Sequence, residues 1–227
     1  MPFRTLFTKW WTLCNESVLG IRTEPQIPAG YVPDPIEPWK GEFSPYAKNR
    51  DNFRYQTIGY WHARRLLRVV KPGSKDTVFD IGCGMGRILC LAAQEPVRKC
   101  VGIELQEPLC QVARRNAARL RKRKAPIEIV WGDAARVDLS EGTIYLLFNP
   151  FGPETLRDTF ENIRGSLAQK PRAIKVVYYH SKYRSAVEPL DWLVKVREFE
   201  RFGGQHPVTI WENRSSEQPA MKHVKCA

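Results

Sequence analysis

The sequence predicts an α/β protein with a mostly parallel sheet, helices on both faces and a C-terminal antiparallel hairpin. Apolar, β-branched runs typical of buried strands alternate with helical apolar spacing from residue 53 to residue 179. Two further strand-like runs then flank the turn-forming segment GGQH at 203–206. Alternation of this kind indicates parallel strands joined by helices, and the hairpin adds one antiparallel strand near an edge of the sheet.

The elements follow one another in a regular order. The run TVFDI at 77–81 is apolar and β-branched enough for a buried parallel strand, and the apolar spacing at 86–95 then predicts a helix. Pro108 suits the first turn of the next helix. We expect helices at 53–70, 86–95, 107–124 and 153–168, and seven strands at 77–81, 99–104, 127–131, 143–148, 173–179, 193–202 and 207–213.

A glycine-rich turn follows the first predicted strand, where residues 80–86 read DIGCGMG. Gly82, Gly84 and Gly86 allow positive φ, and without a Cβ the backbone can approach a ligand closely at the carboxyl end of the strand. Glu104 ends the next predicted strand, where a carboxylate can accept two hydrogen bonds from ribose hydroxyls. This pattern predicts a nucleoside-binding site.

The spacing of the glycines separates two kinds of nucleoside cofactor. A dinucleotide site requires G-x-G-x-x-G, which seats a pyrophosphate at a helix N-terminus, whereas this loop reads G-x-G-x-G. Asp80 precedes the first glycine, and its carboxylate would repel a pyrophosphate but attract an ammonium or a sulfonium. S-adenosylmethionine carries both of these cations and fits the loop.

With these motifs the chain resembles the class I, Rossmann-like S-adenosylmethionine-dependent methyltransferases, over residues 55–211. Four motifs stand in the order of that family: DIGCGMG, GIEL, WGDA and NPFG. The resemblance implies the strand order 3-2-1-4-5-7-6, which periodicity cannot supply. It also implies that the glycine loop passes under the methionine part, that the acid of GIEL holds the ribose, and that the Asp of WGDA meets the adenine amino group. The cofactor-binding candidates are Asp80, Gly82, Cys83, Gly84, Gly86, Glu104, Leu105, Asp133, Ala134 and Asn149.

The segment NPFG at 149–152 defines the chemistry that the resemblance implies. Methyltransferases acting on amino groups carry a similar tetrapeptide, Asn or Asp, Pro, Pro and an aromatic residue, whose amide oxygen and backbone carbonyl hold the nitrogen. Here Phe151 replaces the second proline and Gly152 replaces the aromatic residue, which puts the stacking of a flipped base in doubt. Asn149, Pro150 and Phe151 are the catalytic candidates, although Phe151 can also pack inward beneath a plain turn.

The resemblance and the charge leave three functions open. A methyltransferase acting on the amino nitrogen of a protein, of lysine type, is favoured over an RNA methyltransferase and over a non-catalytic scaffold with the same fold. The net charge of +12 is concentrated at 114–124 and in the arginines of HARRLLR at 62–68, which favours a polyanionic partner, although such a run can also be the solvated face of a helix. His180 follows the fifth predicted strand and could accept a proton or cap the loop.

Composition divides the chain into three parts: an N-terminal segment at 1–50, a methyltransferase domain at 51–214 and a disordered tail at 215–227. Residues 1–22 fit an amphipathic helix whose apolar face either packs back on the domain or docks on a membrane surface or a partner. Residues 24–46 are proline-rich and predict an extended arm. In similar methyltransferases the segment before the first strand closes over the methionine end of the cofactor, which makes Tyr55, Gln56 and Thr57 further contacts.

Location and metal content follow from what the sequence lacks. No run approaches the ~20 apolar residues of a membrane span, and the N-terminus has no apolar signal core, so we expect a cytoplasmic protein. The six cysteines show no metal-binding spacing and predict reduced thiols, most of them buried, with no metal site. Cys83 is expected to pack beneath the cofactor rather than to act as a nucleophile.

Overall fold

The computed structural model describes residues 3–23 and 55–214 and contains one seven-stranded sheet in the order β3-β2-β1-β4-β5-β7-β6. Strands β3, β2, β1, β4 and β5 run parallel, and β7 pairs antiparallel with both β5 and β6. The fold class and the strand order inferred from the resemblance are confirmed. The strands are β1 (Thr77–Ile81), β2 (Lys99–Glu104), β3 (Ile127–Trp131), β4 (Ile144–Phe148), β5 (Lys175–Tyr179), β6 (Leu193–Phe202) and β7 (His206–Asn213).

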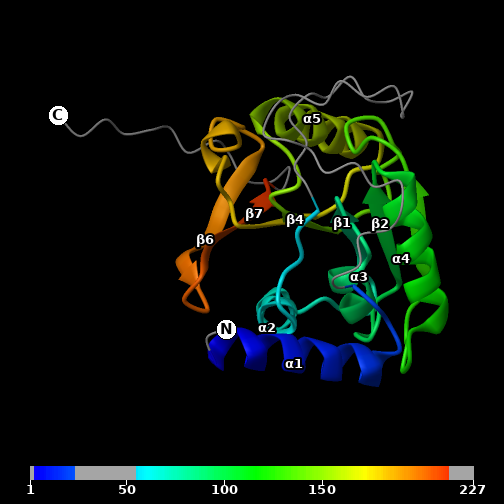
Figure 1. Cartoon of the computed structure of the whole chain (residues 1–227). Helices are drawn as coiled ribbons and strands as arrows, with labels where there is room; N and C mark the ends of the chain where they lie inside the picture. The colour runs from blue at the N-terminus through cyan, green and yellow to red at the C-terminus, as the bar shows by residue number, and fades with distance from the viewer. Residues whose placement is uncertain (1–2, 24–54, 215–227) are drawn as a thin grey trace.

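Helices cover both faces of the sheet (Figure 1). On one face α2 and α3 share an apolar cluster with alternate residues of the strands, among them Val78, Leu146 and Val177. On the other face α5 packs through Leu156 and Phe160 on the intervening strand positions. The helices are α1 (Phe3–Leu19), α2 (Tyr60–Val70), α3 (Arg87–Ala92), α4 (Glu107–Arg119) and α5 (Pro153–Gln169), with a short 3₁₀ helix, η1, at Arg184–Ala186.

Three predicted helices are shorter than their sequence pattern. The helix predicted at 86–95 spans only Arg87–Ala92. The helix predicted from residue 53 begins at Tyr60, because residues 55–59 are extended and the carbonyl of Ile58 accepts a hydrogen bond from Arg87. The helix predicted at 107–124 ends at Arg119. Beyond it the N–H of Lys124 donates to the carbonyl of Ala93, which turns the chain toward β3.

The N-terminal helix exists, but the described side chains of its predicted apolar face point to solvent and do not pack on the domain. Trp10, Leu13 and Val18 belong to the predicted packing face, and all three are exposed. The helix packs on the domain through Thr12 and Glu16, which are buried. The segment therefore docks on the domain through Thr12 and Glu16 together with Leu19 and Ile21, which join the main apolar cluster, and not through the aromatic stripe.

Three predictions fall on residues outside those that the structure describes: the extended arm at 24–46, the disordered tail at 215–227 and the thiol of Cys226. The division of the chain at residues 50 and 214 also stays a prediction. Among the described residues, no helix has both the length and the apolar character needed to cross a membrane.

Candidate functional site

The glycine loop runs from the end of β1 to the start of α3 in the conformation that its sequence predicts. Gly82, Gly84 and Gly86 have φ values of 72°, 54° and 82°. The N–H groups of Gly82 and Cys83 both donate to the carbonyl of Ile103 at the end of β2, each over 2.9 Å. The loop is thus fastened to the neighbouring strand at the carboxyl edge of the sheet.

Two glycines of this loop lie against residues distant in the sequence. A Cβ at Gly82 would stand 2.5 Å from the Cβ of Pro150, so the glycine loop and the NPFG segment are in close contact. A Cβ at Gly84 would collide with the ring of Tyr55. The phenol of Tyr55 donates to the carbonyl of Thr23 over 2.8 Å. Side chains larger than hydrogen are therefore excluded at both positions.

Two buried acids lie at the ends of β1 and β2. Oε2 of Glu104 accepts the N–H of Gly84 over 2.8 Å, and Oε1 accepts the N–H of Gln106 over 2.9 Å. Burial raises the pKa of Glu104, although these N–H groups partly offset it. Burial, and next the charge of Glu104, raise the pKa of Asp80 from 3.8 to about 7. A cationic ligand would favour the ionised form of both acids.

The loop after β3 presents the third predicted acid. Asp133 is buried, and its Oδ1 accepts the N–H of Ala135 over 2.9 Å. Asn162 of α5 donates to the carbonyls of Ala134 and Val137, each over 2.9 Å, and these two hydrogen bonds hold the loop after β3 against α5. Sequence reasoning missed Asn162, because nothing in its local pattern links it to a loop 28 residues away.

The side chain of Trp131, at the end of β3, contacts the loop that follows β2. Its Nε1 donates to the carbonyl of Leu105 over 2.9 Å, while the residue remains partly exposed. Leu105 is thereby held beside the acid of β2, where the sequence predicts the ribose. We did not predict this contact, since Trp131 reads in the sequence only as the end of a strand.

Asn149 directly follows β4 and has a left-handed backbone, φ 41°, which asparagine tolerates better than most residues. Its Oδ1 accepts a hydrogen bond from the hydroxyl of Tyr178 over 2.8 Å. The alternation of Tyr178 and Tyr179 predicts that at most one of them reaches the site, and Tyr178 is the one that contacts Asn149. A carbonyl oxygen has two lone pairs, so the amide oxygen can accept a second donor.

Other candidates lie away from these loops or inside the core. Phe151 is buried against the cluster beneath α5, which matches the inward packing considered as its alternative role. Cys83 is buried, and its Sγ would stand 2.7 Å from a Cβ at Gly102. The rings of His180 and His206 stack with centroids 4.1 Å apart. Burial, and then the charges of His206 and Lys182, lower the pKa of His180.

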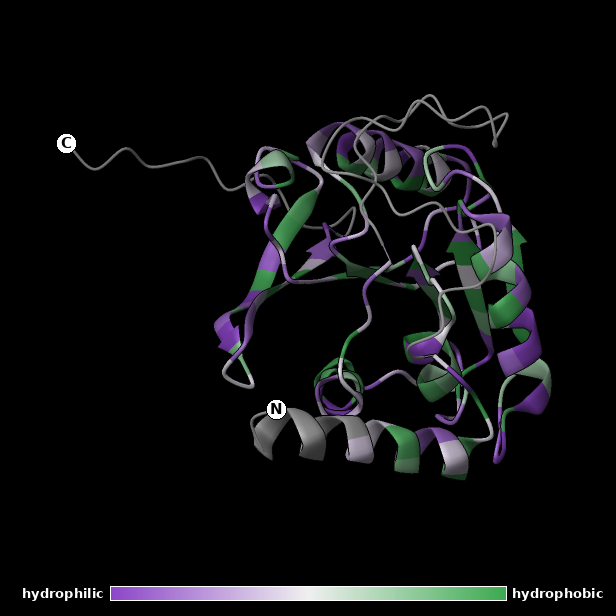
Figure 2. Cartoon of the chain, viewed as in Figure 1, coloured by the Kyte–Doolittle hydropathy of each residue, from purple (hydrophilic) through white to green (hydrophobic). Residues whose placement is uncertain are grey.

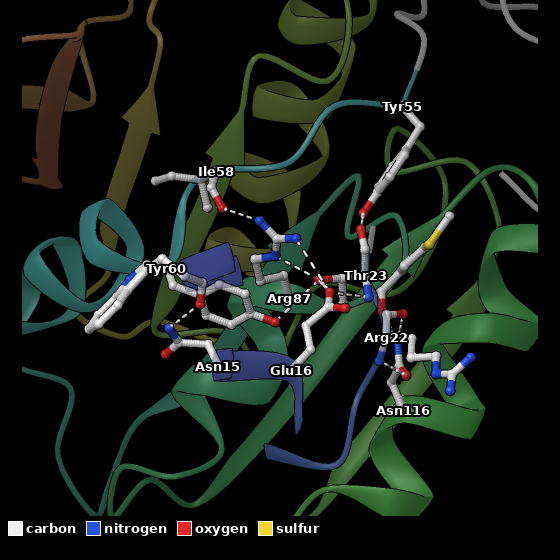
Figure 3. A network of polar contacts seen from close by, with 11 residues as sticks. Asn15, Glu16, Arg22, Thr23, Tyr55, Ile58, Tyr60, Arg87 and Asn116 are labelled. Atoms are coloured by element: carbon white, nitrogen blue, oxygen red, sulfur yellow. Dashed lines mark hydrogen bonds and ion pairs between the residues drawn. The ribbon is translucent and has the colours of Figure 1, made fainter. Parts of the chain in front are cut away.

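A buried polar network fastens the N-terminal segment to the glycine loop (Figure 3). Nε of Arg87 donates to Oγ1 of Thr23 over 2.6 Å, and its guanidinium lies 3.6 Å from Glu16. Asn116 of α4 donates to the carbonyls of Met85 and Arg22 over 2.9 and 2.8 Å. The one sequence signal for this network is Arg87, which begins the otherwise apolar helix α3.

The basic run at 114–124 is exposed along most of its length, but several of its members also make structural contacts. Arg114 lies 3.7 Å from Glu107, and Arg123 donates to the carbonyl of Ala117. Arg121 donates through its backbone N–H to Leu19 and through its guanidinium to Ser17. The run therefore combines a structural role next to α1 with a solvated basic surface.

Known proteins resemble part of this chain in sequence and in fold. Residues 78–170 match a family described as a methyltransferase domain. A protein-lysine N-methyltransferase of Saccharolobus islandicus (strain REY15A) is 37% identical over 95 residues, which cover 37% of this chain and 53% of that protein. The chain thus spans about half the length of this curated relative.

Solved structures give the same result for the fold. An RNA methyltransferase from Salinibacter ruber, in complex with S-adenosyl-L-homocysteine, superposes with a TM-score of 0.54 at 24% identity, covering 72% of this chain and 97% of the other. An S-adenosylmethionine-dependent methyltransferase from Aquifex aeolicus gives a TM-score of 0.53 at 13% identity, covering 67% and 89%.

The sheet order and the loops at its carboxyl edge define an α/β domain of the nucleoside-binding kind. The match to the methyltransferase-domain family runs from within β1 to the end of α5, and so includes the glycine loop, the acids after β2 and β3 and the NPFG segment.

Proposed function

We propose that this protein transfers a methyl group from S-adenosylmethionine to an amino nitrogen of a protein substrate, of lysine type. The observation that carries the proposal is the contact between Gly82 and Pro150, which brings the cofactor loop against the segment that begins with Asn149. The protein-lysine N-methyltransferase of Saccharolobus islandicus supports the choice of acceptor.

The residues at the carboxyl edge of the sheet fit this cofactor. The left-handed glycines let the loop lie close to Pro150 and Tyr55, and the buried carboxylate of Glu104 suits ribose hydroxyls. Asp80 and Glu104 form an acidic pair that a cationic ligand would neutralise. Asp133 and Ala134 would hold the adenine end. The cofactor supplies an electrophilic methyl group on a sulfonium.

The chain's own contribution to the reaction is to orient the acceptor. The second lone pair of the Asn149 amide oxygen would accept an N–H of the neutral amine and would leave the nitrogen lone pair free to accept the methyl group. Tyr178 fixes the amide by its hydrogen bond to the same oxygen. Catalysis then comes mainly from positioning, which can supply several powers of ten in rate.

An RNA acceptor is the second candidate, because the exposed basic run at 114–124 suits a polyanion. One experiment separates the two. Methyl-tritiated cofactor is incubated with the protein and a cell extract, and the labelled products are treated with protease or with ribonuclease. Protein methylation predicts that only protease removes the label from the macromolecular fraction. Loss on ribonuclease treatment would overturn the proposed acceptor, and no label at all would favour a non-catalytic scaffold.

A further inference from the structure

We propose that the outer face of α1 docks on the surface of an anionic lipid bilayer. We define this outer face by Trp10, Trp11, Leu13 and Val18, whose exposed fractions are 58%, 44%, 52% and 65%. The inference does not depend on the methyl acceptor, because it concerns where the protein is held rather than what it methylates.

The orientation of α1 departs from that of an ordinary surface helix, because only Leu19 at its end joins the main apolar cluster while Trp10, Leu13 and Val18 are exposed. Here the buried positions include Thr12 and Glu16. Both the N–H and the hydroxyl of Thr23 donate to Oε1 of Glu16, over 2.6 and 2.7 Å, and Arg87 lies 3.6 Å from the same oxygen. These buried polar contacts fix which side of the helix meets the domain, and they leave the apolar side outward.

The outer face of α1 lies at an extreme of the molecule. In Figure 1 the layers follow in order from α5 through the sheet to α2 and α3, and α1 lies beyond them. Because its polar side faces the domain, its opposite side faces away from the sheet. The described turns of α1 carry hydrophobic positions at this outer layer (Figure 2). Apolar area held in water costs about 25 cal/mol per Å², and contiguous exposed apolar patches mark interaction surfaces.

Basic side chains adjoin this face. The backbone and guanidinium contacts of Arg121 with Leu19 and Ser17 place the exposed Lys122 and Arg123 beside the end of α1. A basic side chain near an anionic leaflet adds roughly 1 kcal/mol of attraction.

A bilayer fits this combination better than a single-stranded nucleic acid or a second copy of the chain does. Tryptophan concentrates at the membrane interface, and Leu13 and Val18 can enter the headgroup boundary, whereas bases could stack only on Trp10 and Trp11 and would leave the two aliphatic side chains uncovered. A second copy of the chain would bring its own basic residues against these, and like charges repel.

The test measures binding of the full chain to vesicles by co-sedimentation. Vesicles of equal parts phosphatidylcholine and phosphatidylglycerol are compared with vesicles of phosphatidylcholine alone. We expect the protein to bind the anionic vesicles and to bind the neutral vesicles at least tenfold more weakly. Binding to the anionic vesicles should weaken as the salt concentration rises. The double variant Leu13→Gln/Val18→Gln should bind at least tenfold more weakly, with an unchanged melting temperature because both side chains are exposed.

The matched control is Val194→Thr/Val196→Thr, which replaces two exposed apolar side chains on β6, an edge strand of the sheet. This control should bind like the wild type. Equal binding of the two double variants would overturn the proposal. So would tight binding of single-stranded RNA, or a dimer in light scattering, that only the Leu13→Gln/Val18→Gln variant loses, because either result would assign the face to another occupant.

Discussion

At Asn149 the backbone and the side chain are fixed by different neighbours. Pro150 follows it and lies against Gly82, while Tyr178 of the adjacent strand β5 binds its amide oxygen. Both contacts are made within the protein itself, so the amide can be held in place before an acceptor arrives. Such pre-organisation is what catalysis by alignment requires.

Asn149→Ala should lower the methyl-transfer rate by about 100-fold or more and leave cofactor binding nearly intact, because the amide serves the acceptor. Asn149→Asp should retain part of the activity, since its carboxylate can still accept the N–H and the hydroxyl of Tyr178. Single-turnover transfer and calorimetry separate the two effects. A loss of thermal stability with unchanged turnover of the folded fraction would instead make NPFG a structural turn.

The acid at the end of β2 has two tasks in this structure. The carboxylate of Glu104 orders the loop through the N–H of Gly84 and is also the proposed ribose ligand. Glu104→Ala should therefore lose charge-assisted hydrogen bonds to the cofactor worth about 1.5–3 kcal/mol, measured by calorimetry. Glu104→Gln keeps one acceptor and should lose less. Wild-type affinity in Glu104→Ala would sink the assignment.

Asp80 gives the site a dependence on pH. Its pKa in the folded protein, about 7, lies above the ordinary 3.8, so the protonated form favours the folded state. The stability that this group contributes is complete below pH 3.8 and is lost as the pH rises through 7. A cationic cofactor favours the ionised form, and its affinity should rise between pH 6 and pH 8.

The measurement is the dissociation constant of S-adenosylmethionine by calorimetry across that range. Asp80→Asn is the control, because it keeps the shape of the side chain and removes its titration, while any titration of the ligand itself affects both proteins equally. An identical pH profile for wild type and Asp80→Asn would exclude Asp80 as the source.

At the scale of elements, local pattern sets the strands better than the helices. The boundaries of β1, β2 and β3 match their predicted runs, because each is a short apolar segment bounded by turn residues. The predicted start of α2 and the predicted end of α4 were wrong, since Arg87 binds the carbonyl of Ile58 and the carbonyl of Ala93 accepts the N–H of Lys124. Helical periodicity carries no information about such partners.

The orientation of α1 shows the same limit more sharply. Periodicity identifies an apolar stripe, but it cannot tell that Glu16 meets an arginine in α3. The candidate site depends on the same kind of contact. Its glycines and acids can be found from motif spacing, whereas the roles of Tyr178, Asn162 and Trp131 come from hydrogen bonds between different layers and loops.

The ion pair of α1 and α3 should matter greatly for stability. Glu16→Gln would leave the buried guanidinium of Arg87 without its carboxylate and should lower the free energy of unfolding by about 3–5 kcal/mol. Urea unfolding of Glu16→Gln and of Ser17→Ala, an exposed neighbour on the same helix, gives the comparison. Equal midpoints for the two variants would show that α1 contributes little to the fold.

At the scale of the whole molecule, the positive charge is distributed unevenly, and its role is measurable. If the basic run contacts phosphates, log affinity for RNA should fall linearly with log salt, and Lys122→Gln/Arg123→Gln should flatten the slope by about 0.7 to 0.9 per lost contact. Arg121 is kept in this variant because it also holds α1. The double variant Arg164→Gln/Lys170→Gln, on and beside α5, removes equal charge from the opposite layer, and an equal slope change there would indicate a general charge effect.

The pair of Glu16 and Arg87 also sets an order of events during synthesis. About 70 residues separate the two, and at a ribosomal rate of about 5–20 residues per second the acid waits for several seconds before its arginine emerges. Until then α1 has no guanidinium to hold its polar side inward, and its aromatic side is open to whatever lies near the exit of the ribosome. The N-terminal segment is made first but can be locked in place only after the glycine loop has been made.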